Sequence, residues 1–185
     1  MNKVNVWCTM ALMMITLGFS ACSDSEDENV AVDPGIIGEW KVTTAQLLYD
    51  EQDPAIFVKE LAKDLGKSVE ELEEAGMKTS IQNEGQDEVG SVFRFNADKT
   101  QQITFPGGDD EEDDTYKGTW SASENTLTVF YGDDDKGTEY EVRSITKNQA
   151  TLAYVKRPTK DDLLDYYSIE PDEAFTITTL LYLEK

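Results

Sequence analysis

Carboxylates are the most abundant side chains in this sequence that could do chemistry. The densest runs are residues 109–114 and 133–135, and they raise the possibility of calcium, because hard cations bind oxygen ligands. Neither run has the alternating ligands, central glycine and final glutamate of an EF-hand loop. Consecutive carboxylates also point in different directions, so the sequence favours solvated loops over an ordered cation site.

The remaining residues give little support for a catalytic function. A glycosidase needs a carboxyl group whose pKa is raised by an apolar pocket, whereas these acids cluster in loops open to solvent. The chain has no histidine, which excludes histidine-based nucleophilic catalysis and histidine-ligated zinc or haem. Gly107 and Gly108 precede acidic residues that would repel phosphate. We therefore predict a protein that is not an enzyme and that holds no cofactor or metal.

Charge and composition limit the partners and the size of the fold. The chain has 185 residues, 38 of them acidic and 16 basic, for a formal charge of -22. Such a charge argues against nucleic acid, whose phosphates are bound by surplus lysine and arginine. The hydrophobic content of 39% is too high for a disordered polyanion and predicts one domain with a core.

The N-terminus predicts a secreted lipoprotein. Lys3 precedes an apolar stretch, residues 4–19, that is too short for a membrane span and ends in small residues. Residues 19–22, Phe-Ser-Ala-Cys, resemble the bacterial lipobox, which implies cleavage before a cysteine that is then acylated. We therefore expect a signal peptide over residues 1–21 and a lipid on Cys22, with no cysteine left for a disulfide. The alternative is an uncleaved anchor with a free thiol at Cys22.

Residues 22–34 predict a flexible tether, because acidic and turn-forming residues directly after Cys22 offer nothing apolar to pack. The acidic stretch at residues 23–28 resembles the export signal of surface lipoproteins in Bacteroidetes. That resemblance implies a lipid-anchored protein of the outer membrane, exposed at the cell surface. The alternative is a plain linker that faces the periplasm.

Residues 35–185 predict an antiparallel meander of short strands, each apolar on one face and polar on the other. The eight strands are expected at residues 39–49, 91–95, 101–105, 115–120, 125–131, 137–145, 149–155 and 174–184. Tight turns are expected at residues 96–99, 121–124 and 146–148, which are rich in turn formers. The fold class is therefore all-β.

Three short helices are expected in the longer connections. Residues 55–65 have apolar side chains at helical spacing, and Ser68 with Glu71 forms a capping-box pattern. A third helix should begin after Thr159 and end near Tyr167, before the last strand. We expect all three to cover a barrel end or an outer face without contributing chemistry.

Several segments resemble the lipocalin-like domains of Bacteroidetes lipoproteins. They are Gly38-Glu39-Trp40, residues 93–100, Gly118-Thr119-Trp120-Ser121 and the strand through Leu127. The resemblance covers residues 35–155 and the last strand, residues 174–183. It implies an eight-stranded up-and-down barrel that encloses a small apolar ligand and has no enzyme activity. The helical insertion after the first strand departs from a plain lipocalin, which usually has a simple loop there.

Aromatic residues dominate the positions that such a barrel would turn inward. Trp40 at the start of the first strand is expected to plug the barrel end rather than contact a ligand. Whether the interior holds a cavity or a packed core stays open, because both satisfy the same pattern. The candidate ligand-binding residues are Trp40, Phe93, Phe95, Tyr116, Trp120, Tyr131, Tyr140 and Tyr154.

Two functions are compatible with these features. The first is a lipid-anchored binding protein for a small apolar or amphipathic molecule, and the second is a protein-interaction module of an envelope assembly with a filled barrel. In an up-and-down order the four long connections share one end, and residues 50–90, 106–114, 132–136 and 156–173 hold 27 acidic and 8 basic residues. An acidic mouth that faces away from the membrane would disfavour anionic ligands such as fatty acids and favour neutral or cationic ones.

Overall fold

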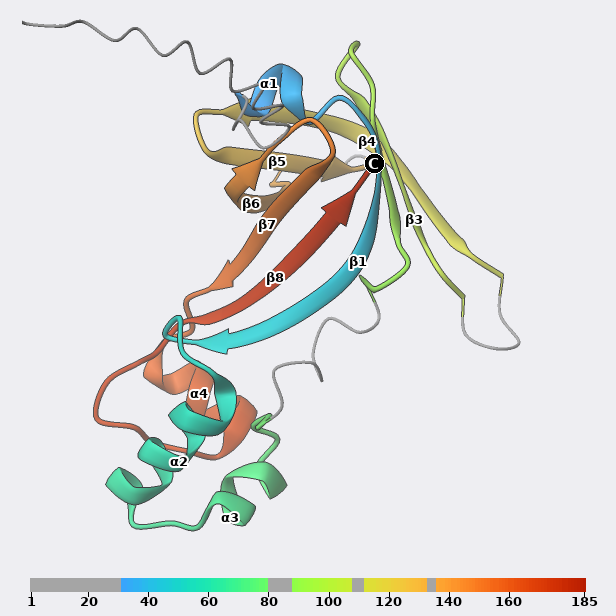
Figure 1. The fold of residues 1–185 in the computed structure, drawn as a ribbon. Helices are drawn as coiled ribbons and strands as arrows, with labels where there is room; N and C mark the ends of the chain where they lie inside the picture. The colour runs from blue at the N-terminus through green and yellow to red at the C-terminus, as the bar shows by residue number, and fades with distance from the viewer. Residues whose placement is uncertain (1–30, 80–87, 108–111, 133–135) are drawn as a thin grey trace, which may run out of the picture.

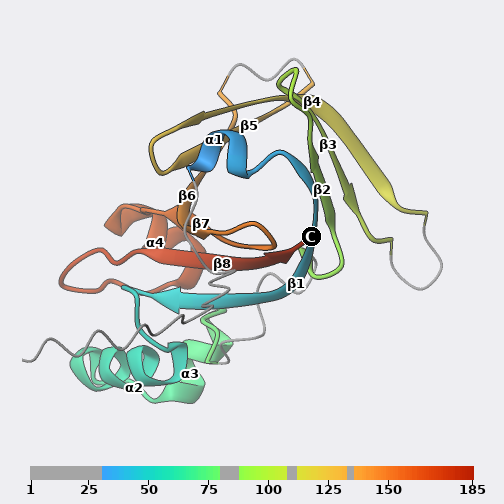
Figure 2. The ribbon, with the colours of Figure 1, turned by 45° about the horizontal axis from the view of Figure 1, so that its top comes forward.

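The eight predicted strands are all present and form a closed antiparallel barrel. The computed structural model describes residues 31–79, 88–107, 112–132 and 136–185. The strands follow one another in up-and-down order, and β8 pairs with β1 to close the sheet. Figure 2 shows β1 and β8 running side by side at this closure. The strands are β1 Gly38–Tyr49, β2 Val92–Phe95, β3 Thr100–Phe105, β4 Asp114–Ser123, β5 Thr126–Tyr131, β6 Thr138–Ile145, β7 Gln149–Lys156 and β8 Ile177–Glu184.

Two strand boundaries differ from the prediction by more than one residue. β4 continues to Ser123, because Ser121 and Ala122 pair with β5, so the turn contains only Glu124 and Asn125. Glu124 adopts a positive φ of 48°, which this short connection demands. β8 begins at Ile177, and Phe175 packs before the strand begins instead of within it.

A β-bulge in β1 keeps both halves of this long strand facing inward. The pairing with β8 shifts between Val42 and Thr44, which leaves Thr43 as the extra residue. Trp40 and Val42 are buried on one side of the bulge, and Leu47 and Tyr49 are buried on the other. A strand without the bulge would turn one of these pairs outward, because side chains alternate with a period of two.

The three predicted helices are confirmed, and their ends follow from local hydrogen bonds. They are α2 Pro54–Leu65, α3 Val69–Glu74 and α4 Lys160–Tyr167. In the capping box of α3, Ser68 Oγ accepts a hydrogen bond from the Glu71 amide at 3.2 Å, and Glu71 Oε2 accepts one from the Ser68 amide at 2.7 Å. Asp53 caps α2, and Thr159 forms a second capping box at the start of α4.

These helices gather where β1 ends and β8 begins, as Figure 1 shows. They form a second hydrophobic cluster with the ends of those strands, separate from the core inside the barrel. Tyr49 of β1 lies at its centre, with the Phe57 ring centroid at 5.4 Å and the Phe175 centroid at 5.6 Å. Their packing agrees with the expectation that these helices cover a barrel end or an outer face.

A short helix that the sequence analysis did not predict, α1 Val32–Gly35, lies beside β4 and β6 at the other end of the barrel (Figure 1). Val32 and Ile36 are buried against the barrel core, and Asp33 forms an ion pair with Lys99. The last residues of the stretch assigned to the tether are therefore packed on the barrel.

The remaining N-terminal predictions lie outside the described residues. These are the signal peptide over residues 1–21 and the lipidated Cys22. Within the described part of the chain, no helix has the length and apolar character needed to cross a membrane.

Candidate functional site

The end of the barrel next to α1 is filled by side chains, and we call it the closed end. Trp40 has no exposed surface, and its indole Nε1 donates a hydrogen bond to the Ile36 carbonyl at 2.6 Å. Trp120 Nε1 likewise donates to the Asn96 carbonyl at 3.0 Å. The ring centroids of Phe95 and Trp120 are 5.8 Å apart. Each indole therefore has a partner for its polar edge, and the rings exclude water from this half of the interior.

The opposite half of the barrel, which we call the mouth, contains a cavity of ≈ 430 Å³. Its walls come from strands on all sides of the barrel and from the segment just before β2. The lining residues are Glu88, Phe93, Phe105, Tyr131, Thr138, Tyr140, Tyr154, Lys156, Thr179 and Leu181. The barrel interior is thus divided between a packed closed end and a hollow mouth.

An open, more apolar depression of ≈ 500 Å³ adjoins this cavity at the rim. The two share Glu88, Phe105 and Tyr131, so they lie directly side by side. The depression is lined by Glu88, Phe105, Pro106, Asp114, Tyr116 and Tyr131. The depression therefore offers an apolar surface beside the cavity, at the rim.

Five aromatic side chains, one from each strand from β3 to β7, line this space and form what we call the aromatic belt. They are Phe105, Tyr116, Tyr131, Tyr140 and Tyr154. The Tyr116 ring centroid lies 5.7 Å from that of Phe105 and 6.1 Å from that of Tyr131. The ring centroids of Tyr140 and Tyr154 are 6.0 Å apart. The hydroxyls of Tyr131 and Tyr140 interact with each other, which joins the two halves of the belt.

Burial sets the chemistry of the central tyrosines. Desolvation raises the pKa of Tyr131, and it raises the pKa of Tyr140, which is only 8% exposed, far above the ordinary value. Both hydroxyls therefore stay neutral at every physiological pH. They can donate and accept hydrogen bonds inside the cavity, but they supply no base or nucleophile there.

The structure brings five of the eight candidate residues together. Phe93, Tyr131, Tyr140 and Tyr154 line the cavity, and Tyr116 lines the adjoining depression with 46% of its surface exposed. The other three candidates lie at the closed end, away from both spaces. They are Trp40, Phe95 and Trp120. Trp40 thus lies where a plug of the barrel end was expected.

Several polar residues of the interior are absent from the predicted set. Glu88 precedes β2 in an acidic connection, where nothing in the sequence distinguishes it from its neighbours. Lys156, Thr138 and Thr179 follow the same period-two alternation as the aromatic residues and could have been found from it. Gln101 is buried in β3, and its Nε2 donates to the Phe130 carbonyl at 3.2 Å.

Another depression, of ≈ 650 Å³, lies on the surface of α2 and the start of α3. Its lining lysines, Lys59, Lys63 and Lys67, are exposed, and of the residues lining it only Ala62 is buried.

The described residues contain no cluster of three or more acidic or cysteine side chains arranged to hold a metal ion. The acidic positions 109–111 and 133–135 lie outside the described part of the chain. The barrel mouth is therefore the candidate site.

Comparison with known proteins agrees with this architecture. The family model described as a lipocalin-like domain matches residues 36–152. The chain belongs to the lipocalin-like domain family. No curated protein matches the sequence. The family match ends within β7, so the pairing of β8 with both β7 and β1 is what completes the lipocalin-like barrel in this chain.

Proposed function

We propose that this lipocalin-like domain binds one small apolar or amphipathic molecule in the mouth of its barrel and catalyses no reaction on it. The observation that carries the proposal is the cavity of ≈ 430 Å³ above a packed closed end. Its aromatic walls with a few polar groups are typical of small-molecule sites. A barrel filled with side chains throughout, as the interaction-module alternative supposes, would leave no such space.

Charge around the mouth favours a neutral or cationic ligand. Glu88 lines both the cavity and the depression, Asp114 lines the depression, and Lys156 is the one cation among the described residues that lines either of them. The up-and-down strand order brings all four acidic connections to this end. We expect anions such as free fatty acids to bind weakly, most clearly at low salt, because added salt screens the repulsion.

The cellular location that we propose is the outer membrane, with a lipid on Cys22 and the barrel exposed at the surface. The lipobox-like residues 19–22 and the acidic residues that follow support this location. The N-terminal side of the chain reaches the barrel at Val32, at the closed end. A lipid anchor would therefore leave the mouth turned away from the membrane.

Filling the cavity is expected to abolish binding. Thr179 lies in the cavity wall, so Thr179→Trp places an indole where the ligand would lie. We expect its affinity for a hydrophobic fluorescent probe to fall at least tenfold, measured by fluorescence titration, with unchanged far-UV circular dichroism. Thr119→Trp, on the exposed outer face of β4, is the matched control and should bind like the wild type. Equal, saturable binding by both variants would contradict a ligand site in the barrel.

Removal of Cys22 is expected to release the protein from the membrane. Cys22→Ser should prevent incorporation of labelled palmitate and should shift the protein to the soluble fraction of lysed cells. Cys8→Ser is the control, because that residue lies within the predicted signal peptide and should leave labelling unchanged. Surface exposure is measured separately, by digestion of intact cells with protease. Continued labelling of Cys22→Ser would disprove the lipidation site.

A further inference from the structure

Glu88 places a carboxylate without a side-chain partner among the described residues against the aromatic belt. It lines both the cavity and the adjoining depression, at the point where the two meet. Its side chain is half-buried, and within the described residues it forms no ion pair or side-chain hydrogen bond. The negative charge of Glu88 adds to the effect of burial in raising the pKa of Tyr131 and Tyr140, as expected for a carboxylate close to both rings.

The belt already accepts an ammonium group at one edge. Lys156 Nζ lies 5.6 Å from the ring centroid of Tyr154. This separation is within the range at which the negative face of an aromatic ring attracts a cation. The Lys156 side chain is exposed and belongs to the last residue of β7, so it occupies the rim. The inner rings of the belt have no such cation from the described residues over them.

Neighbouring rings of the belt are inclined to one another. The Tyr116 and Tyr131 rings are almost perpendicular, at 87°, and the Tyr140 and Tyr154 rings are inclined at 49°. Rings that surround a space in this way can present several faces to one cation, which is how proteins recognise organic ammonium groups. A carboxylate within the same space adds direct charge attraction, and the partly excluded solvent weakens its screening.

We propose that the aromatic belt and the Glu88 carboxylate bind the ammonium group of an organic amine or quaternary ammonium compound. The apolar part of the ligand lies along Phe105 and Pro106 in the adjoining depression. This inference rests on the proposed ligand-binding function and assigns it a chemical class. Asp114 in the depression attracts the same cation, whereas Lys156 at the rim of the cavity repels it.

Three probes with the same eight-carbon chain test the proposal on the purified protein. They are octyltrimethylammonium, 1-octanol and octanoate, each titrated calorimetrically at low and high salt. We expect the cation to bind about tenfold tighter than the alcohol, the anion to bind most weakly, and the preference for the cation to shrink at high salt. Equal binding of cation and alcohol, or tighter binding of the anion, would overturn the ammonium site but leave the binding function intact. If none of the probes shows saturable binding, both fail.

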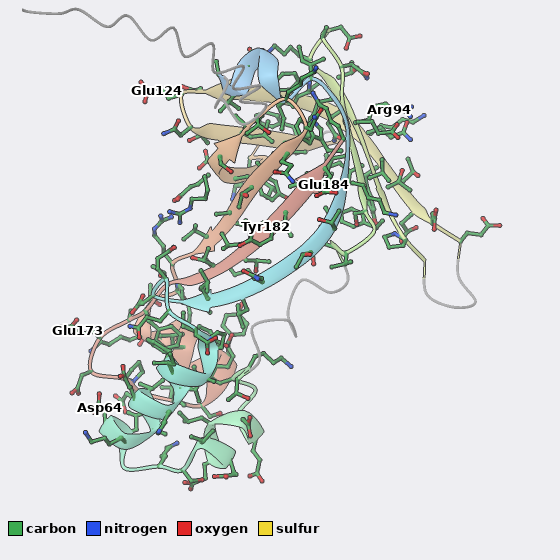
Figure 3. The ribbon with its side chains drawn as sticks, in the orientation of Figure 1. Asp64, Arg94, Glu124, Glu173, Tyr182 and Glu184 are labelled. Carbon is green, nitrogen blue, oxygen red and sulfur yellow. The ribbon has the colours of Figure 1, made fainter. Side chains whose placement is uncertain are left out.

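Glu88→Gln removes the charge and keeps the shape of the side chain. It should weaken binding of octyltrimethylammonium about tenfold and change binding of 1-octanol less than twofold. Glu124→Gln changes the net charge equally, but Figure 3 shows Glu124 at the turn between β4 and β5, at the closed end. An equal loss of cation affinity in this control would show that overall charge, not the site, attracts the cation. If Glu88→Gln fails to fold, Tyr154→Leu provides the second test, with an expected selective loss of cation affinity.

Discussion

Trp40→Ala is expected to lower the free energy of unfolding by about 3–5 kcal/mol, the usual range for removing a fully buried tryptophan. The substitution opens a void beneath α1 at the closed end. It also leaves the Ile36 carbonyl without the indole donor that now lies at 2.6 Å. Lys185 Nζ, which lies 4.4 Å from the centre of the Trp40 ring, loses its aromatic contact as well. Urea unfolding monitored by circular dichroism measures the change.

The matched comparison is Tyr116→Ala, which removes a large aromatic side chain from the rim. Tyr116 is 46% exposed, so its loss should cost about 1 kcal/mol. For ligand binding, by contrast, Tyr116→Ala should have the larger effect. Folded Trp40→Ala protein should bind a hydrophobic probe normally, because Trp40 lies outside the cavity, whereas Tyr116→Ala should bind it more weakly. A stability loss for Trp40→Ala no larger than that for Tyr116→Ala would contradict the plug assignment.

Strand order and most strand boundaries could be predicted from the sequence because each strand buries a single face. Leu127 and Val129 alternate with Thr126 and Thr128 in β5, and such alternation specifies both the strand and its inner side. The bulge in β1 was not predicted. Its signal is present, since the buried positions change phase between Val42 and Ala45, but a phase change alone does not tell a bulge from the end of a strand.

α1 escaped prediction because its stability comes from tertiary contacts. A four-residue helix has too few internal hydrogen bonds to form alone. Here Val32 and Ile36 pack on the barrel core, and Trp40 Nε1 donates to the Ile36 carbonyl. These partners are brought to the helix only by the closed barrel, so a local sequence pattern could not indicate it.

The candidate site was predicted in part for a related reason. Alternation identified the belt residues of β4 to β7, but it could not separate a ring that lines a cavity from one that fills the core. That distinction depends on how far along the barrel axis each residue lies. Trp120 lies near the short turns of the closed end, whereas Tyr116 lies four residues earlier in β4, near the rim. Glu88 lies in a connection, where no period applies.

Gly118 lies between Tyr116 and Trp120 in β4, and its lack of a side chain allows a residue of β3 to form a hydrogen bond with β5. It lies on the inner face of β4, between Gln101 of β3 and Tyr131 of β5 in the pairing. Gln101 Nε2 reaches past it to donate to the Phe130 carbonyl at 3.2 Å. A β-carbon on Gly118 would lie 1.8 Å from that carbonyl oxygen and 3.1 Å from Nε2. The side chain must therefore be absent for β4 and β5 to approach each other.

Gly118→Ala is accordingly expected to destabilise the fold by about 3–5 kcal/mol, since strand separation adds to the cost of an unpaired buried amide and carbonyl. Gly66→Ala is the control: its positive φ of 64° strains alanine, but no atom lies within 4 Å, so the cost should be about 1 kcal/mol. The double variant Gly118→Ala with Gln101→Ala locates the clash. Because the closest atom belongs to the Phe130 backbone, removal of the glutamine side chain should restore little stability. Full recovery in denaturant unfolding would instead assign the constraint to Gln101 and contradict the backbone contact.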